Sequence, residues 1–316
     1  MKKLRLKTFA IIMLSVFSLY ISAAEDITYL FPAASKGDLA AVNAMLSSGA
    51  NANATDNTGV TALMYAARKD KVKVVATLLN HGADINTVDK SGWTALMYAA
   101  KKNHIETARL LLDKKADPKI RDTAGWSALG LAAASGYAPM VDLILKHGVD
   151  VNLKSDSGKT VLMYAAKNGD VATMTTLLNN QAQVQMQDKM GTTALMVAAR
   201  QGHVKAVELL VNKGAKTNQQ DLAKWTALTW AVKKSQVDAA KALIAAGADV
   251  NNIDSEGTPL LHVAVDNGQS AMVKLLLDNK VNTKAKDQYS LTALVYALKG
   301  QHTEIAQLIK AAGGSY

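Results

Sequence analysis

Residues 89–100 read Asp89-Lys90-Ser91-Gly92-Trp93-Thr94-Ala95-Leu96-Met97-Tyr98-Ala99-Ala100. The leucine and the first alanine of the Ala-Ala pair return every 33 residues, as Leu63, Leu96, Leu129, Leu162, Leu195, Leu228, Leu261 and Leu294, and as Ala66, Ala99, Ala132, Ala165, Ala198, Ala231, Ala264 and Ala297. A fixed step without insertions indicates that one supersecondary unit has been copied in tandem. Because such units bury their core only between neighbours, the chain is predicted to form a repeat solenoid.

Each unit is predicted to contain a turn, a helix, a second turn, a second helix and a loop. Gly92 marks the first turn, since glycine adopts left-handed backbone conformations at little cost, and the hydroxyl of Thr94 can cap the first helix. Small side chains such as Ala99 let the first helices of neighbouring units approach closely. In the second helix the apolar residues follow a helical period, at Ile105, Ala108, Leu111 and Leu112.

The unit resembles the ankyrin repeat, whose pattern is Asp, two variable residues, Gly, then Thr-Pro-Leu-His, later Leu-Leu and finally Gly-Ala-Asp. The resemblance covers about nine units, from about Ile27 to Gly313. It implies an all-α solenoid of paired antiparallel helices joined by β-turn or hairpin loops. Residues 25–316 are then expected to form one ankyrin-repeat domain, with residues 27–58 as its N-terminal cap and residues 288–316 as its C-terminal cap.

Two departures from the pattern bear on the fold. The dipeptide Thr258-Pro259 is displaced by one position relative to Leu261. Glycine ends the second helix in six units, but three units have another residue there, namely Lys115, Gln181 and Lys280. A non-glycine residue in a left-handed helix cap costs roughly 1 kcal/mol. We therefore expect these three junctions to be the weakest in the stack.

Residues 1–24 have the layout of a bacterial secretory signal peptide. Basic residues precede an apolar run from Thr8 to Ile21, and small residues at Ser22 and Ala24 suit cleavage after Ala24. The run is shorter than the roughly 18 to 20 residues that span a bilayer, so no lasting membrane insertion is expected. The absence of cysteine excludes a lipid anchor and disulfide bonds. We expect a periplasmic protein, with secretion from the cell as the alternative.

The positive charge is concentrated at one part of each unit. The formal net charge is +10, and removal of the signal-like segment with its four cations leaves +6. The two positions that end each first helix hold nine cations and one carboxylate, namely Arg68, Lys69, Lys101, Lys102, Lys167, Arg200, Lys233, Lys234, Lys299 and Asp266. Export argues against a nucleic-acid partner for this basic chain. A solvated face, or pairing with the helix dipole, would also explain these cations.

Aromatic residues gather at two equivalent positions of the unit. The first aromatic column follows the turn glycine, or the residue that replaces it, and contains Val60, Trp93, Trp126, Lys159, Thr192, Trp225, Thr258 and Leu291. The second aromatic column lies in the first helix and contains Tyr65, Tyr98, Leu131, Tyr164, Val197, Trp230, Val263 and Tyr296. Because the first column also accepts lysine and threonine, we expect it to face solvent. Exposed tryptophan beside a cation is typical of binding hot spots, whereas the tyrosines are equally consistent with packing.

Residues that could perform chemistry all belong to repeating positions. His104, His203 and His302 are 33 residues or a multiple apart and match the framework of the resembled family, and the aspartates at Asp56, Asp89, Asp122, Asp188, Asp221, Asp254 and Asp287 suit turns, where a carboxylate accepts backbone N–H bonds. No metal-ligand spacing, nucleophile elbow or phosphate-binding glycine loop is present. We therefore expect no catalytic residue, no metal and no cofactor.

The sequence thus predicts an interaction scaffold that binds an acidic protein partner. The expected binding surface is the one that is concave in ankyrin-repeat proteins. The expected contact residues are Trp93, Trp126, Trp225, Trp230, Tyr65, Tyr98, Tyr164, Arg68, Lys101, Lys102, Lys167, Arg200 and Lys233. Three alternatives remain open: an inhibitor or immunity protein of a periplasmic toxin or hydrolase, an effector released toward host proteins, and binding of anionic glycan or lipopolysaccharide. The partner's identity and the oligomeric state are left open.

Overall fold

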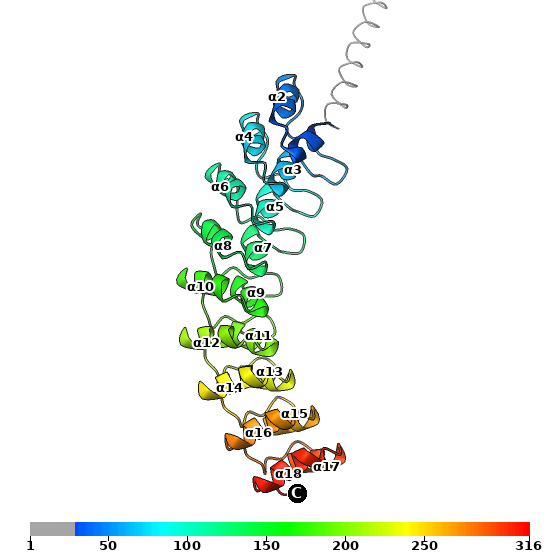
Figure 1. Cartoon of the computed structure of the whole chain (residues 1–316), viewed down its shortest axis with the longest axis vertical. Helices are drawn as coiled ribbons and strands as arrows, with labels where there is room; N and C mark the ends of the chain where they lie inside the picture. Colours follow the sequence, from blue (N-terminus) through cyan, green and yellow to red (C-terminus); the bar gives the residue numbers. More distant parts are fainter. Residues whose placement is uncertain (1–28) are drawn as a thin grey trace, which may run out of the picture. The chain divides into compact units, whose positions relative to one another are not determined.

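The computed structural model describes residues 29–316, and these residues are almost entirely helices and turns (Figure 1). Within this range, β structure is limited to isolated bridges in the turns, such as Thr55 with Thr61 and Lys154 with Thr160. The all-α repeat architecture predicted from the sequence is confirmed. The signal-like segment 1–24 lies outside the described residues. No helix in residues 29–316 has both the length and the apolar character needed to cross a bilayer.

The helices follow the predicted order, in which a short helix over the Ala-Leu stretch precedes a second helix. After helical residues 29–36 come α2 (Leu39–Ser47), α3 (Ala62–Arg68), α4 (Val72–Asn80), α5 (Ala95–Lys101), α6 (Ile105–Asp113), α7 (Ala128–Ala134), α8 (Ala138–Leu145), α9 (Val161–Asn168), α10 (Val171–Asn179), α11 (Ala194–Gln201), α12 (Val204–Asn212), α13 (Ala227–Lys233), α14 (Val237–Ala245), α15 (Leu260–Asp266), α16 (Ser270–Asp278), α17 (Ala293–Lys299) and α18 (Thr303–Ala311).

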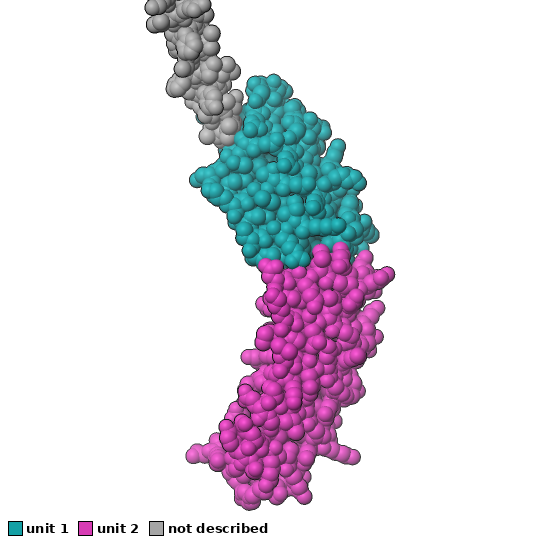
Figure 2. All heavy atoms as spheres, turned by 180° about the vertical axis from the view of Figure 1, so that it is seen from behind, with its two compact units in different colours: residues 1–132, 142–149 teal, residues 133–141, 150–316 magenta. Residues whose placement is uncertain are grey.

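The described residues divide into two compact units (Figure 2). Unit 1 contains residues 29–132 and 142–149, unit 2 contains residues 133–141 and 150–316, and α7 and α8 contribute to both. Within unit 1, α3 contacts α4 and α5, and α4 contacts α2 and α6. Within unit 2, each odd-numbered helix from α9 to α15 contacts the next odd-numbered helix, and each from α9 to α17 contacts the even-numbered helix that follows it. Each unit is thus built by stacking, as a repeat core requires.

The residues that define the 33-residue step form the core of both units. All eight leucines and all eight alanines of the two series are at most 2% exposed. Methionine packs beside them at Met64, Met97, Met163 and Met196, which are equally buried. The alanines allow the first helices to lie close together, and leucine and methionine fill the remaining space. The periodic residues are therefore explained by packing alone.

Hydroxyl and carboxylate groups fix the turns as predicted. The Oγ1 atom of Thr94 accepts the N–H of Met97 at 3.2 Å, and threonines cap α3, α9, α11 and α13 in the same way. The displaced Pro259 stands at the cap position of α15 and makes no side-chain cap bond. In the turns that hold an aspartate, one carboxylate oxygen accepts two backbone N–H groups, as Asp89 does from Ser91 at 2.8 Å and Trp93 at 2.9 Å. The structural role expected for these aspartates is confirmed.

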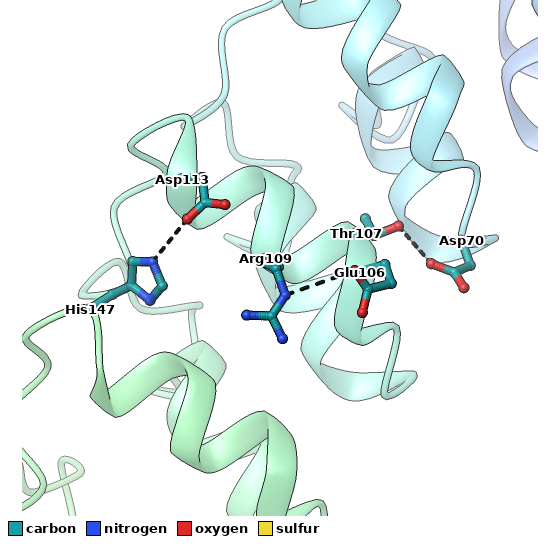
Figure 3. A network of polar contacts seen from close by, with 6 residues as sticks. All are labelled: Asp70, Glu106, Thr107, Arg109, Asp113 and His147. Carbon is teal, nitrogen blue, oxygen red and sulfur yellow. Dashed lines mark hydrogen bonds and ion pairs between the residues drawn. The ribbon is translucent and has the colours of Figure 1, made fainter.

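Polar side chains also link neighbouring repeats. The amide of Asn218 donates to the carbonyl of Gly247 at 3.3 Å and accepts the N–H of Asp249 at 2.8 Å. On the side of the second helices in unit 1, the Thr107 hydroxyl donates to Asp70 at 2.7 Å, while Nε2 of His147 lies 3.4 Å from Asp113 (Figure 3). Because such bonds satisfy loop groups across a repeat boundary, they add specificity to the apolar stacking.

The ends of the second helices adopt the left-handed conformation inferred from the sequence. The glycines at this position, Gly49, Gly82, Gly148, Gly214, Gly247 and Gly313, all have positive φ, and so do Lys115 at 68°, Gln181 at 66° and Lys280 at 60°. A Cβ added to any of these glycines would meet no atom within 4 Å. The cost of a side chain at this position therefore arises from the backbone conformation and not from crowding.

The Gln181→Gly variant is expected to raise the free energy of unfolding by up to about 1 kcal/mol, because it removes the strain of a left-handed glutamine. The greater conformational entropy of glycine in the unfolded chain offsets part of this gain. Thermal unfolding followed by circular dichroism measures the change. The reciprocal Gly214→Gln variant is the matched control and should lower the melting temperature. A lower melting temperature for Gln181→Gly would refute the strain at this junction.

Candidate functional site

In unit 1, the turn aspartates connect the two aromatic columns. The Tyr98 hydroxyl donates to Oδ2 of Asp89 at 2.6 Å, and the indole N–H of Trp93 donates to Oδ2 of Asp122, one repeat further on, at 2.9 Å. The rings of Trp93 and Tyr98 lie 5.0 Å apart in a tilted arrangement. Both side chains are half-buried. Trp93 is therefore only partly exposed, and a hydrogen bond holds its ring. The expectation that the first aromatic column faces solvent is met only in part, because Val60 in the same column is buried.

Arg68 lies between two aromatic rings of unit 1. Its guanidinium carbon is 4.9 Å from the centroid of Tyr65 and 5.8 Å from that of Tyr98. The Tyr65 hydroxyl donates to Asp56 at 2.7 Å. Burial alone would raise the pKa of Asp56, but hydrogen bonds from Thr58, Tyr65 and the turn N–H groups outweigh it and lower the pKa to about 2. The carboxylate that holds Tyr65 is therefore charged at neutral pH.

The Trp126 ring packs where a glycine of α7 has no side chain. Gly130 stands where several other repeats have the buried methionine, and a Cβ there would lie 3.1 Å from Cε3 of Trp126. The indole ring thus lies close over α7, and it is half-buried like Trp93. A residue larger than glycine at this position would push the ring outward, so Trp126 depends on its local sequence.

In unit 2 the two tryptophans form one cluster with Arg200. The rings of Trp225 and Trp230 meet edge to face at 4.7 Å, and the Arg200 guanidinium lies 5.1 Å from the Trp230 centroid. The indole N–H of Trp230 donates to Asp221 at 2.9 Å, and that of Trp225 donates to Asp254 at 3.3 Å. Aromatic pairs and cation–π contacts of this kind orient side chains that remain partly exposed.

The predicted cations divide into two groups. Arg68 and Arg200 are half-buried on aromatic rings, whereas the lysines are exposed, namely Lys101, Lys102, Lys167 and Lys233. Within unit 2, Lys167 and Arg200 are brought together with Tyr164, Trp225 and Trp230 around a single hollow. The structure thus joins a subset of the residues predicted for partner binding into one site.

The hollow has a volume of about 610 Å³ and lies over α9, α11 and α13. Its walls are formed by Tyr164 on one side and by Trp225 and Trp230 on the other. The repeat between them has Thr192 in the first aromatic column and Val197 in the second. These side chains are much smaller than tryptophan or tyrosine. The space that an aromatic ring occupies at the same positions in other repeats therefore stays open.

Two parts of this site were not predicted from the sequence. One is the hollow itself, and the other is the pair of apolar turn tips at its rim, Met190 and Leu222, which are 65% and 70% exposed. The two columns held only a partial signal, because Thr192 and Val197 interrupt the aromatic series together but so do Thr258 and Val263 two repeats further on. Tyr164 also differs from the other tyrosines, because its hydroxyl is 3.4 Å from Oγ of Ser155, which stands where most repeats have aspartate.

The histidines serve the framework, as predicted. Nε2 of His104 contacts the carbonyl of Arg68 at 3.1 Å, and Nε2 of His203 contacts that of Lys167 at 3.0 Å. His262 is buried against Tyr296, and this burial lowers the pKa of its imidazole. In residues 29–316 no group of three or more His, Asp or Glu side chains is placed to hold a metal ion. The site offers aromatic rings and cations, which are groups for binding.

Comparison with known proteins agrees with the repeat unit and its geometry. The family model described as ankyrin repeats (3 copies) matches four overlapping segments, residues 30–122, 115–188, 162–254 and 247–315. No curated protein matches the chain. The matched segments cover nearly all of the described residues. The chain therefore belongs to the ankyrin-repeat family, and its repeats mark it as a scaffold for protein–protein interaction.

Proposed function

We propose that this chain is an exported, non-catalytic scaffold that binds an acidic protein partner in the periplasm. The partner contacts the face formed by the turns and the odd-numbered helices. The signal-like layout of residues 1–24 supports export. The repeats support a protein partner, and the cations along the odd-numbered helices support an acidic one.

One observation carries the proposal. In each unit, half-buried aromatic rings are held in place by turn carboxylates and bordered by cations, as Tyr98 is by Asp89 and Arg68 in unit 1, and Trp230 by Asp221 and Arg200 in unit 2. A ring with a fixed orientation loses little conformational entropy when a partner covers it. Rigid aromatic side chains and arginine are also the residues most enriched in binding hot spots.

A pull-down from periplasmic extract tests the proposal. The tagged full chain should recover one acidic protein, and the Trp93→Ala, Trp126→Ala double variant should lose it, because both indole rings leave the face. Tyr316→Ala is the matched control, since it removes an aromatic ring that is 74% exposed at the far end of the chain. Circular dichroism confirms that the variants are folded. Unchanged recovery by the folded double variant would refute the proposed surface in unit 1.

A further inference from the structure

We propose that the hollow in unit 2 binds an acidic segment of the partner protein that inserts one large apolar side chain. The inserted side chain takes the place that Thr192 and Val197 leave open in the aromatic columns. Carboxylates of the segment pair with Arg200 and Lys167 at its edge. This inference rests on the proposed function and assigns the chemistry of the partner at one site.

The shape of the hollow supports an inserted side chain. Its volume of about 610 Å³ is within the usual range of roughly 300 to 1,000 Å³ for binding pockets. The T-shaped pair of Trp225 and Trp230 forms one wall, and the ring of Tyr164 stands on the other side. An aromatic or aliphatic side chain between these walls would complete the face as tyrosine and tryptophan do in neighbouring repeats.

The charges around the hollow favour an anionic ligand. Its lining holds four cations, Lys159, Lys167, Lys189 and Arg200, and two carboxylates, Asp188 and Asp221. One oxygen of each aspartate already accepts two turn N–H groups, and the other oxygen of Asp221 accepts the indole N–H of Trp230. Among the described residues, the Arg200 guanidinium contacts the Trp230 ring and has no carboxylate partner. A carboxylate of the bound segment would provide an ion-pair partner for Arg200.

The rim of the hollow supports a protein segment as the occupant. Met190 and Leu222 lie at two neighbouring turn tips, which are joined by a hydrogen bond from the Leu222 N–H to the Met190 carbonyl at 3.0 Å. This bond keeps both apolar residues at the edge of the hollow. Exposed methionine and leucine beside an aromatic pocket can contact the residues that flank an inserted side chain. A peptide chain supplies such flanking residues together with its carboxylates.

The Val197→Tyr variant tests the inference by filling the hollow. The new hydroxyl can bond to Asp188 as the Tyr98 hydroxyl bonds to Asp89, because both pairs have the same spacing of nine residues. Every cation of the lining is kept, and the fold should be at least as stable. The matched control is Val263→Tyr, the same change in the same column two repeats further on, where valine is also 7% exposed and lies outside the hollow.

The probe is a library of random peptides displayed on phage and selected on the full chain, followed by fluorescence polarisation with the synthetic peptide that is most enriched. We expect enrichment of Asp and Glu around one aromatic or aliphatic residue. Val197→Tyr should weaken binding of that peptide by about 30-fold or more, as expected when a hot-spot pocket is blocked. Val263→Tyr should leave the affinity unchanged.

A second pair of variants tests the charge. Arg200→Gln should weaken peptide binding by about tenfold, since a desolvated carboxylate loses its partner. Lys205→Gln removes the same charge from the exposed surface of α12. It should weaken peptide binding no more than a small increase in salt concentration does. Equal effects of the two variants would show that only overall charge matters, which would overturn the proposed pairing with Arg200.

Three other results would overturn the inference. The first is a selection that yields no peptide or yields peptides without acidic residues. The second is equal binding by Val197→Tyr and the unchanged chain. The third is that the chain binds lipopolysaccharide vesicles and no peptide, and that Val197→Tyr abolishes this vesicle binding. Such a result would assign the hollow to an anionic glycan. If Val197→Tyr still recovers the partner that Trp93→Ala, Trp126→Ala loses, the proposed function stands and only the hollow is excluded.

Discussion

The Leu195→Ala variant is expected to lose about 3 to 4 kcal/mol of unfolding free energy, because it leaves a cavity in a core that cannot collapse. Leu195 is 1% exposed in α11, and this helix contacts α9, α12 and α13. One truncated side chain therefore weakens the packing of three neighbours. Urea unfolding followed by circular dichroism measures the loss. Hydrogen exchange should show that α9, α11 and α13 lose protection before the rest of unit 2.

Leu222→Ala is the matched control for this loss. It removes the same atoms from a side chain that is 70% exposed, so its effect on stability should stay within about 0.5 kcal/mol. Equal losses in the two variants would contradict a core built on the leucine series. Because Leu222 borders the hollow, the same control also separates stability from binding: it should weaken peptide binding while leaving the fold intact.

The fold could be predicted from the sequence because its cause is periodic. Leu195 and Ala198 stand in series without an insertion, and a stack of identical helix pairs is the packing that such a series allows. The left-handed caps were predictable for a related reason. Gln181 occupies a position that glycine holds in six other repeats, so its backbone conformation follows from that of those glycines.

The candidate site was less predictable, because it depends on contacts between repeats. The spacing of Trp93 does not show that its indole N–H reaches an aspartate 29 residues away. An interpretation of the tryptophan column as simply solvent-facing therefore omits the hydrogen bonds that hold these rings. The hollow depends on two small residues, Thr192 and Val197, whose effect appears only when the rings on both sides are placed in space.

The Asp221→Ala variant is expected to lose about 3 kcal/mol of unfolding free energy and to weaken binding at the hollow. Asp221 is 9% exposed and accepts three hydrogen bonds, from the N–H groups of Ala223 and Trp225 and from the indole N–H of Trp230, each at 2.9 Å. Hydrogen bonds to a charged group contribute about 1.5 to 3 kcal/mol, and their donors would be left without a protein acceptor. Urea unfolding and fluorescence polarisation measure the two effects.

Asp221→Asn separates the turn from the tryptophan. Its remaining oxygen can still accept the two turn N–H groups, but its amide nitrogen is a donor and cannot accept the indole N–H of Trp230. We therefore expect a smaller loss of stability, about 1 to 2 kcal/mol, together with most of the loss of peptide binding. If Asp221→Asn bound the peptide as tightly as the unchanged chain, the carboxylate would serve the turn alone. In that case the orientation of Trp230 would have to come from its packing against Trp225 and Arg200.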